Sequence, residues 1–141
     1  MKVVGFNFTR ISIERLEGSK ESKEKVSINT NIDIPEISEV KSDILLNSEE
    51  GFIGAKFNYG VNYDPKMAKV ILEGKILISL DKNSMKEILD SWKDKKLPSD
   101  FKLFLFNVVL KKSTLKALQL EEELNLPLHM PLPSFKKEEK K

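Results

Sequence analysis

The sequence of 141 residues contains no cysteine and a single histidine, His129. These absences exclude disulfides, a thiolate nucleophile, Cys-based zinc or iron–sulfur sites, and any metal centre with several histidine ligands. Of the 24 basic residues only Arg10 and Arg15 are arginines, and positive and negative charges are interleaved to give a net charge of +2. We therefore expect no nucleic-acid partner, because such proteins usually concentrate basic residues, Arg above all, on one face.

Long apolar runs are also missing. No stretch approaches the roughly 18 apolar residues of a membrane span, and the N-terminus lacks the pattern of a secretory signal. We therefore expect a cytoplasmic protein without direct membrane insertion. With 40% hydrophobic residues the chain can bury a core without a disulfide or a metal. We expect one domain over residues 1–135 and a charged tail without fixed structure over residues 136–141.

Alternation of apolar and polar residues predicts four strands, of which the first two are irregular. In the segment Val3–Leu16 the apolar positions change parity near Thr9 and Arg10, which indicates a bulge. The second strand runs from Val26 to Pro35, while residues 36–50 give no clear pattern.

The third and fourth strands give the strongest signal in the sequence. Apolar residues occupy the odd positions of residues 53–63 and mostly the even positions of residues 68–80, and Asp64–Pro65 marks a turn between them. The pattern predicts an antiparallel hairpin with one face on a core and a Lys-rich face toward water.

The period then changes to that of helices. Ser84 and Glu87 fit a capping box at the start of a short helix, and Ser99 can cap a second helix that ends near Leu124. The apolar residues of segment 101–110 point to nearly all sides of that helix. A four-stranded sheet covers only one side, so the rest of the helix needs another partner.

The segment LNLPLHMPLPSF at residues 124–135 follows the second helix. Pro127, Pro131 and Pro133 lack amide donors and favour an extended backbone, from which a row of apolar side chains projects.

Four strands, a polar crossover, a long helix and an aliphatic, proline-spaced stretch that ends in Phe resemble the SecB family of protein-export chaperones and its SecB-like relatives. The part LFNVVLKKSTLKALQLEEELNLPLHMPLPSF carries most of the resemblance. It implies an α+β fold, in which a four-stranded antiparallel sheet carries a long C-terminal helix and a shorter helix on one face. It also implies a homo-oligomer, a dimer of dimers, with the long helices between the sheets.

The resemblance further implies an ATP-independent holdase, not an enzyme, that binds unfolded or non-native polypeptides in hydrophobic grooves without a cofactor or metal. A link to protein export follows from the family, but we do not transfer a SecA-type motor as a partner. Docking to SecA uses acidic patches in the family, whereas this chain has a net charge of +2. The chain also has KKEEKK where the bacterial proteins continue into a further short helix that shapes the groove.

Two sets of candidate residues follow. For the client-binding groove we predict Trp92, Phe101, Leu126, Leu128, Met130, Leu132 and Phe135. For the oligomer interface we predict Phe104, Phe106, Val108, Val109 and Leu110. For the apolar row of the proline-spaced segment, packing in the subunit's own core stays open as an alternative. For the aromatic residues of the groove, packing in the oligomer interface stays open.

Two polar features have simpler interpretations. His129 lies between prolines without a nucleophile motif, which is typical of a packing or turn residue. The run Glu121–Glu122–Glu123 is typical of a solvated helix face rather than of a cation site. Two other functions stay open: a dedicated chaperone or adaptor for one partner, such as a toxin–antitoxin system, and a small-ligand-binding protein that uses the cleft between sheet and helices.

Overall fold

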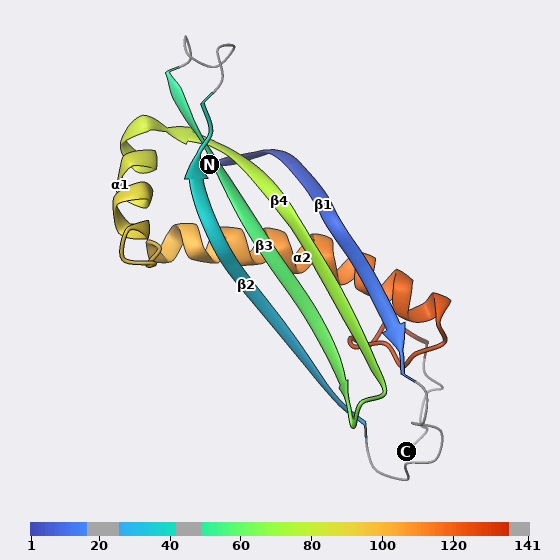
Figure 1. Ribbon diagram of the computed structural model, residues 1–141. Helices are drawn as coiled ribbons and strands as arrows, with labels where there is room; N and C mark the ends of the chain where they lie inside the picture. Colours follow the sequence, from blue (N-terminus) through green and yellow to red (C-terminus); the bar gives the residue numbers. More distant parts are fainter. Residues whose placement is uncertain (17–25, 42–48, 136–141) are drawn as a thin grey trace, which may run out of the picture.

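The computed structural model describes residues 1–16, 26–41 and 49–135, which form a four-stranded antiparallel sheet with two helices (Figure 1). The strands follow the spatial order β1-β4-β3-β2. This α+β architecture confirms the predicted fold class. The predicted tail and the unassigned apolar residues 44–46 lie outside the described residues. In chain order the elements are β1 (Lys2–Arg15), β2 (Ser27–Glu39), β3 (Glu50–Asp64), β4 (Ala68–Asp81), α1 (Lys82–Trp92) and α2 (Ser99–Glu123).

The central hairpin is formed by β3 and β4, as predicted. Its register runs from the pair Glu50–Asp81 to the pair Tyr63–Ala68 without a shift. The odd positions of β3 from Ile53 onward and the even positions of β4 are buried, so one face of the hairpin supplies most of the core. Alternation fixes which face is buried, because a slip by one residue would expose every core side chain.

The outer strands β1 and β2 both contain register shifts. The predicted bulge in β1 is confirmed by a register shift between Phe8 and Arg10. The prediction that β2 ends at Pro35 is wrong, because the strand continues to Glu39 with a register shift between Asp33 and Glu36. β2 is an edge strand, and a bulge at an edge can hold a proline that has no amide to donate.

Both helices begin differently from the capping prediction. Asp81 caps α1, and its carboxylate accepts hydrogen bonds from the backbone N–H of Ser84 at 2.9 Å and from the Ser84 hydroxyl at 2.7 Å. Ser84 is therefore a donor inside the first turn and not the cap. These hydrogen bonds lower the pKa of Asp81. Ser99, predicted as the cap of α2, is instead its first residue, and Pro98 occupies the capping position.

α2 crosses one face of the sheet diagonally (Figure 1). Every fourth residue of the helix is buried: Phe101, Leu105, Val109, Ser113, Ala117 and Glu121. On the other side of the helix the side chains of Leu103 and Leu115 are each 63% exposed. The subunit thus covers one side of α2 and leaves apolar side chains open on the other. Neither helix in the described part of the chain is long and apolar enough to cross a membrane.

Candidate functional site

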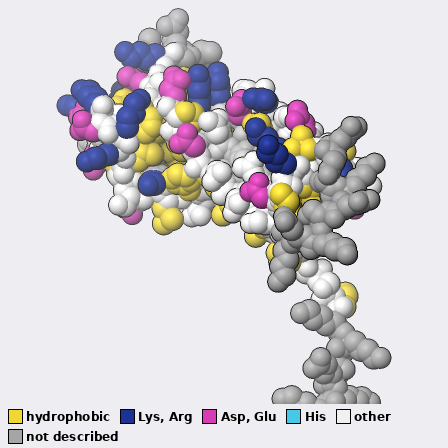
Figure 2. Space-filling model, turned by 60° about the horizontal axis from the view of Figure 1, so that its bottom comes forward, with side chains coloured by type: hydrophobic (Ala, Val, Ile, Leu, Met, Phe, Trp, Pro, Cys, Tyr) yellow, Lys and Arg dark blue, Asp and Glu magenta, His cyan; other side chains and the backbone are white. Residues whose placement is uncertain are grey.

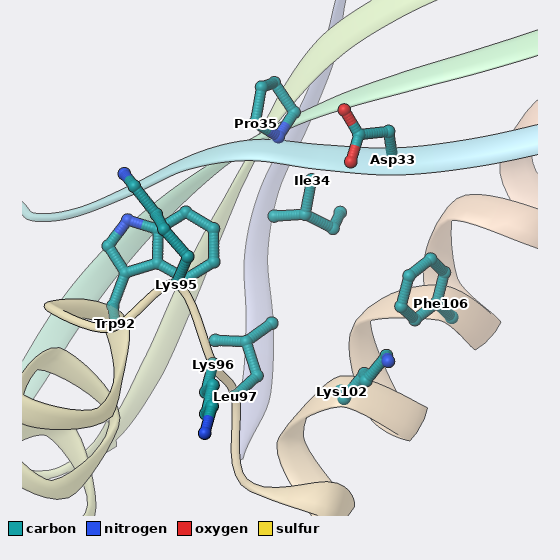
Figure 3. Close-up of a pocket in the computed structure, with 9 residues that line it drawn as sticks. All are labelled: Asp33, Ile34, Pro35, Trp92, Lys95, Lys96, Leu97, Lys102 and Phe106. Carbon is teal, nitrogen blue, oxygen red and sulfur yellow. The ribbon is translucent and has the colours of Figure 1, made fainter.

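A cleft with a volume of about 560 Å³ lies where the edge strand β2 faces the connection between α1 and α2 (Figure 3). Three parts of the chain, far apart in sequence, build it: the bulged segment of β2, the end of α1 with the following turn, and the first turns of α2. Its lining comprises Asp33, Ile34, Pro35, Trp92, Lys95, Lys96, Leu97, Lys102 and Phe106.

The interior of the cleft is apolar. Ile34 reaches from β2 toward Leu97 and Phe106, and the Trp92 ring stands beside them (Figure 3). Ile34 belongs to the buried core, whereas Trp92, Leu97 and Phe106 are half-buried and keep part of their surface open. Large aromatic side chains of this kind can bury much apolar area against a ligand without demanding one particular shape.

The rim of the cleft is basic. The Nζ atom of Lys95 lies 4.7 Å from the centroid of the Trp92 ring, and that of Lys102 lies 5.7 Å from the centroid of the Phe106 ring. Both distances are within the range of cation–π attraction, which holds the ammonium groups over the apolar surface. Asp33 is the acidic residue of the lining.

A tight turn after α1 carries Lys95 and Lys96. The backbone N–H of Lys96 donates to the carbonyl of Ser91 at 3.2 Å, and that of Lys95 donates to the carbonyl of Trp92 at 2.8 Å. This pair of bonds is a Schellman motif that ends α1. Lys95 adopts φ 57°, a left-handed conformation that glycine usually occupies in this motif.

The proline-spaced segment lies at the opposite end of α2, where a second Schellman motif turns the chain back. The backbone N–H of Leu126 donates to the carbonyl of Glu121 at 2.9 Å, and that of Asn125 donates to the carbonyl of Glu122 at 3.0 Å. Asn125 takes the left-handed position with φ 53°. From there the chain passes along the end of the sheet (Figure 1).

A buried polar network fixes that segment. The side chains of Glu121 and His129 are 0% and 2% exposed. Glu121 Oε1 accepts a hydrogen bond from the backbone N–H of His129 at 2.8 Å, and both carboxylate oxygens lie within 2.9 Å of His129 Nδ1. The short contact between the Glu121 carboxyl group and His129 Nδ1 is a hydrogen bond that holds one proton between the two groups. On its other side the imidazole Nε2 lies 2.7 Å from the hydroxyl of Tyr59.

The two tyrosines of the chain attach the same segment to β3. The Tyr63 hydroxyl donates to the carbonyl of Pro127 at 2.6 Å, and the Tyr59 hydroxyl also lies 3.3 Å from that of Thr114. Burial raises the pKa of both tyrosines. Their hydroxyls therefore remain protonated and able to donate. The polar groups of this network are hydrogen-bond partners of one another, and together they hold the proline-spaced segment against β3 and α2.

The structure separates the residues that were predicted to form one groove. Trp92 lies in the cleft, whereas Met130, Leu132 and Phe135 are exposed at the far end of α2 and Leu128 is half-buried there. Phe101 and Leu126 are 2% and 5% exposed. These two side chains pack in the subunit's own core and cannot contact a client in this conformation, so we leave them out of the groove.

The predicted interface residues also divide. Leu110 is exposed, and Phe104, Phe106 and Val108 are half-buried. Val109 is fully buried, because it belongs to the stripe of α2 that faces the sheet, and it is not available to a partner. The exposed Leu103 and Leu115 were not among the predicted interface residues, although the four-residue period of the buried stripe places Leu103 on the outer side.

The interpretation of Glu121 as part of a solvated face is wrong, although its neighbours Glu122 and Glu123 are exposed. Glu121 continues the buried stripe of α2 in steps of four, and that spacing was the available signal. The interpretation of His129 as a packing residue is confirmed by its burial. Within the described segments no group of three or more acidic or histidine side chains could hold a metal ion.

No family model and no curated protein matches the sequence. A solved structure with a similar fold is the SecB-like chaperone of Mycobacterium tuberculosis in complex with a ChAD peptide from the HigA1 antitoxin. The two chains superpose with a TM-score of 0.50 over 95% of this chain and 90% of that chain, at 8% sequence identity. The comparison shows a SecB-like fold and therefore supports the family resemblance at the level of architecture.

Proposed function

We propose that this protein is a SecB-like chaperone that binds non-native polypeptide segments without ATP and without covalent chemistry. The observation that carries the proposal is the open cleft in which Trp92 and Phe106 keep part of their apolar surface accessible. The fold supports it further, because the similar mycobacterial protein is a chaperone that was solved with a bound peptide. We place this activity in the cytoplasm and propose no motor partner.

Binding in this cleft would be driven by removal of apolar client side chains from water. Each square ångström of apolar surface buried contributes about 25 cal/mol, so one client side chain gives only a modest affinity. The cleft borders the edge strand β2, along which an extended client segment can run. Several weak sites on one assembly raise the avidity, because later segments of the same client bind intramolecularly.

We propose that the assembly is a homotetramer, arranged as a dimer of dimers through the open side of α2. Leu103, Leu110 and Leu115 are exposed there in the single subunit. Apolar side chains repeated along one helix face would be an aggregation hazard on a monomer, and a second copy of the helix can cover them. The exposed residues Met130, Leu132 and Phe135 would extend the client surface beyond the cleft.

A second candidate is a dedicated chaperone for one partner. It is favoured by the antitoxin peptide in the complex of the mycobacterial protein. A dedicated chaperone binds one partner tightly and suppresses the aggregation of arbitrary clients poorly, so one assay separates the two functions.

That assay follows light scattering by an unfolded test protein diluted from denaturant, with the chaperone at equimolar subunits and no nucleotide. We expect the wild type to suppress most of the scattering. The double variant Trp92→Ser/Phe106→Ser should bind clients at least about ten-fold more weakly, because it removes two large apolar surfaces. The variant Val26→Ser changes an exposed apolar residue that does not line the cleft, and it should act like the wild type.

Unchanged scattering in the presence of the wild type, for several unrelated test proteins, would contradict a general holdase. Tight capture of one antitoxin or toxin by the same preparation would then establish the dedicated chaperone instead. If the double variant and the wild type suppress aggregation equally, the cleft is not the client site.

A further inference from the structure

The charges around the cleft are unbalanced. Lys95, Lys96 and Lys102 line it, and none of them forms a salt bridge with an acidic group in residues 1–16, 26–41 and 49–135. Asp33 is the acidic residue in the lining. The lining therefore contains three lysines and one acidic residue.

Two of the nearby carboxylates, those of Glu36 and Asp90, pair with lysines outside the cleft lining, whereas Asp94 and Asp100 form no salt bridge within the described residues. Glu36, which follows the bulge of β2, pairs with Lys56 at 2.9 Å, and Asp90 on α1 pairs with Lys93 at 3.6 Å. The hydrogen bond from Lys56 and its charge lower the pKa of Glu36, with smaller contributions from Lys75 and Lys95. Glu36 and Asp90 therefore form no salt bridge with Lys95, Lys96 or Lys102.

Two lysines of the cleft lie directly against its apolar surface. Lys95 and Lys102 hold their ammonium groups over the rings of Trp92 and Phe106, the surfaces that would contact a client side chain. In Figure 3 the ends of Lys96 and Lys102 lie on the side of the cleft away from Asp33. In Figure 2 hydrophobic side chains lie among Lys and Arg side chains at the α1 end of the molecule, with Asp and Glu side chains interspersed.

We propose that this cleft is selective for polypeptide segments in which an aromatic or aliphatic residue is flanked by Asp or Glu. The inference rests on the proposed function and specifies its ligand. The apolar side chain occupies the space between Ile34, Trp92 and Phe106, and the neighbouring carboxylates meet the rim lysines. Charge complementarity of this kind contributes mainly to selectivity and to the rate of association.

The same features favour a peptide over a nucleic acid. The interior of the cleft includes the aliphatic Ile34 and Leu97, which suit aliphatic side chains rather than bases. The lining contains no arginine, and the lysines gather at one cleft instead of following a long groove that could track a phosphate backbone.

The test compares three short fluorescein-labelled peptides by anisotropy. Each has a central Leu-Phe pair, flanked on both sides by Asp in the first peptide, by Asn in the second and by Lys in the third. We expect the Asp peptide to bind the wild type roughly ten-fold more tightly than the Asn peptide, with the Lys peptide weakest. The preference should shrink as NaCl is raised, since salt screens exposed charges.

Two matched variants locate the effect. The variant Lys95→Gln/Lys96→Gln/Lys102→Gln should lose the preference for Asp while it binds the Asn peptide as the wild type does. The control Lys2→Gln/Lys69→Gln/Lys82→Gln also removes three positive charges, but at exposed lysines outside the cleft. The two variants therefore have the same net charge. It should keep the preference.

Equal binding of the Asp and Asn peptides by the wild type would overturn the selectivity and leave the proposed function intact. Failure of all three peptides to bind would overturn both. A preference that survives in the cleft variant or disappears in the control would show that the cleft lysines do not cause it. Displacement of the Asp peptide by a single-stranded oligonucleotide, at lower concentration than by unlabelled Asp peptide, would assign the cleft to a nucleic acid.

Discussion

The substitution Glu121→Ala should lower the free energy of unfolding by about 3 kcal/mol or more, because it removes a buried acceptor from two donors at once. The backbone N–H and the Nδ1 atom of His129 both hydrogen-bond to this carboxyl group, and the His129 side chain is only 2% exposed, so water does not readily replace the contact with the ring. For a domain of this size the loss corresponds to a fall of roughly 10 °C in the thermal midpoint. Thermal and urea unfolding, followed by circular dichroism, measure it.

The adjacent helix position supplies the matched control. Glu122 is exposed, so Glu122→Ala should change the stability by less than about 0.5 kcal/mol. Glu121→Gln keeps the shape of the side chain and one acceptor oxygen, and it should fall between the two. Hydrogen exchange should also increase around His129 in Glu121→Ala. Equal stability of Glu121→Ala and Glu122→Ala would show that the network does not hold the proline-spaced segment.

The double substitution Leu103→Ser/Leu115→Ser should dissociate the proposed tetramer into smaller species. Each leucine is 63% exposed in the single subunit, and its burial in an interface contributes about 1.5–3 kcal/mol. In a symmetric interface each substitution counts on both subunits, so the association should weaken by roughly a thousand-fold or more. Size-exclusion chromatography with multi-angle light scattering reports the mass directly.

Since both leucines face away from the sheet, the variant should retain the circular dichroism of a folded subunit. The control Val26→Ser/Leu132→Ser makes the same kind of change at two exposed apolar residues outside α2 and should leave the mass unchanged. A wild type that is already monomeric, or a variant with the mass of the wild type, would rule out the open side of α2 as a self-association surface.

Much of the fold follows from local patterns. The alternation in residues 53–63 and 68–80 predicts β3 and β4 because the burial of one face fixes the register of a strand pair. Pro35 misled the prediction for β2, since a proline ends a central strand but is tolerated at an edge, and the edge position is a property of the whole sheet.

The candidate site was less accessible to sequence reasoning. Trp92 was predicted as a binding residue, but its neighbours Ile34 and Phe106 come from two other elements whose packing no local pattern reveals. Phe101 and Val109 were misplaced because an apolar helix does not by itself show which side faces its own sheet. The partnership of Glu121 with His129 depends on a chain reversal at Asn125, whose left-handed conformation the sequence analysis did not anticipate.

The most direct test of the chaperone proposal uses Trp92, the single tryptophan of the chain, which lines the cleft. Its fluorescence can be followed while a tryptophan-free, permanently unfolded polypeptide is added without nucleotide. We predict a saturable shift of the emission to shorter wavelengths and weaker quenching by acrylamide, because a bound client covers the exposed part of the ring. Emission and quenching that stay unchanged at a large excess of client would contradict the binding of non-native polypeptides in this cleft.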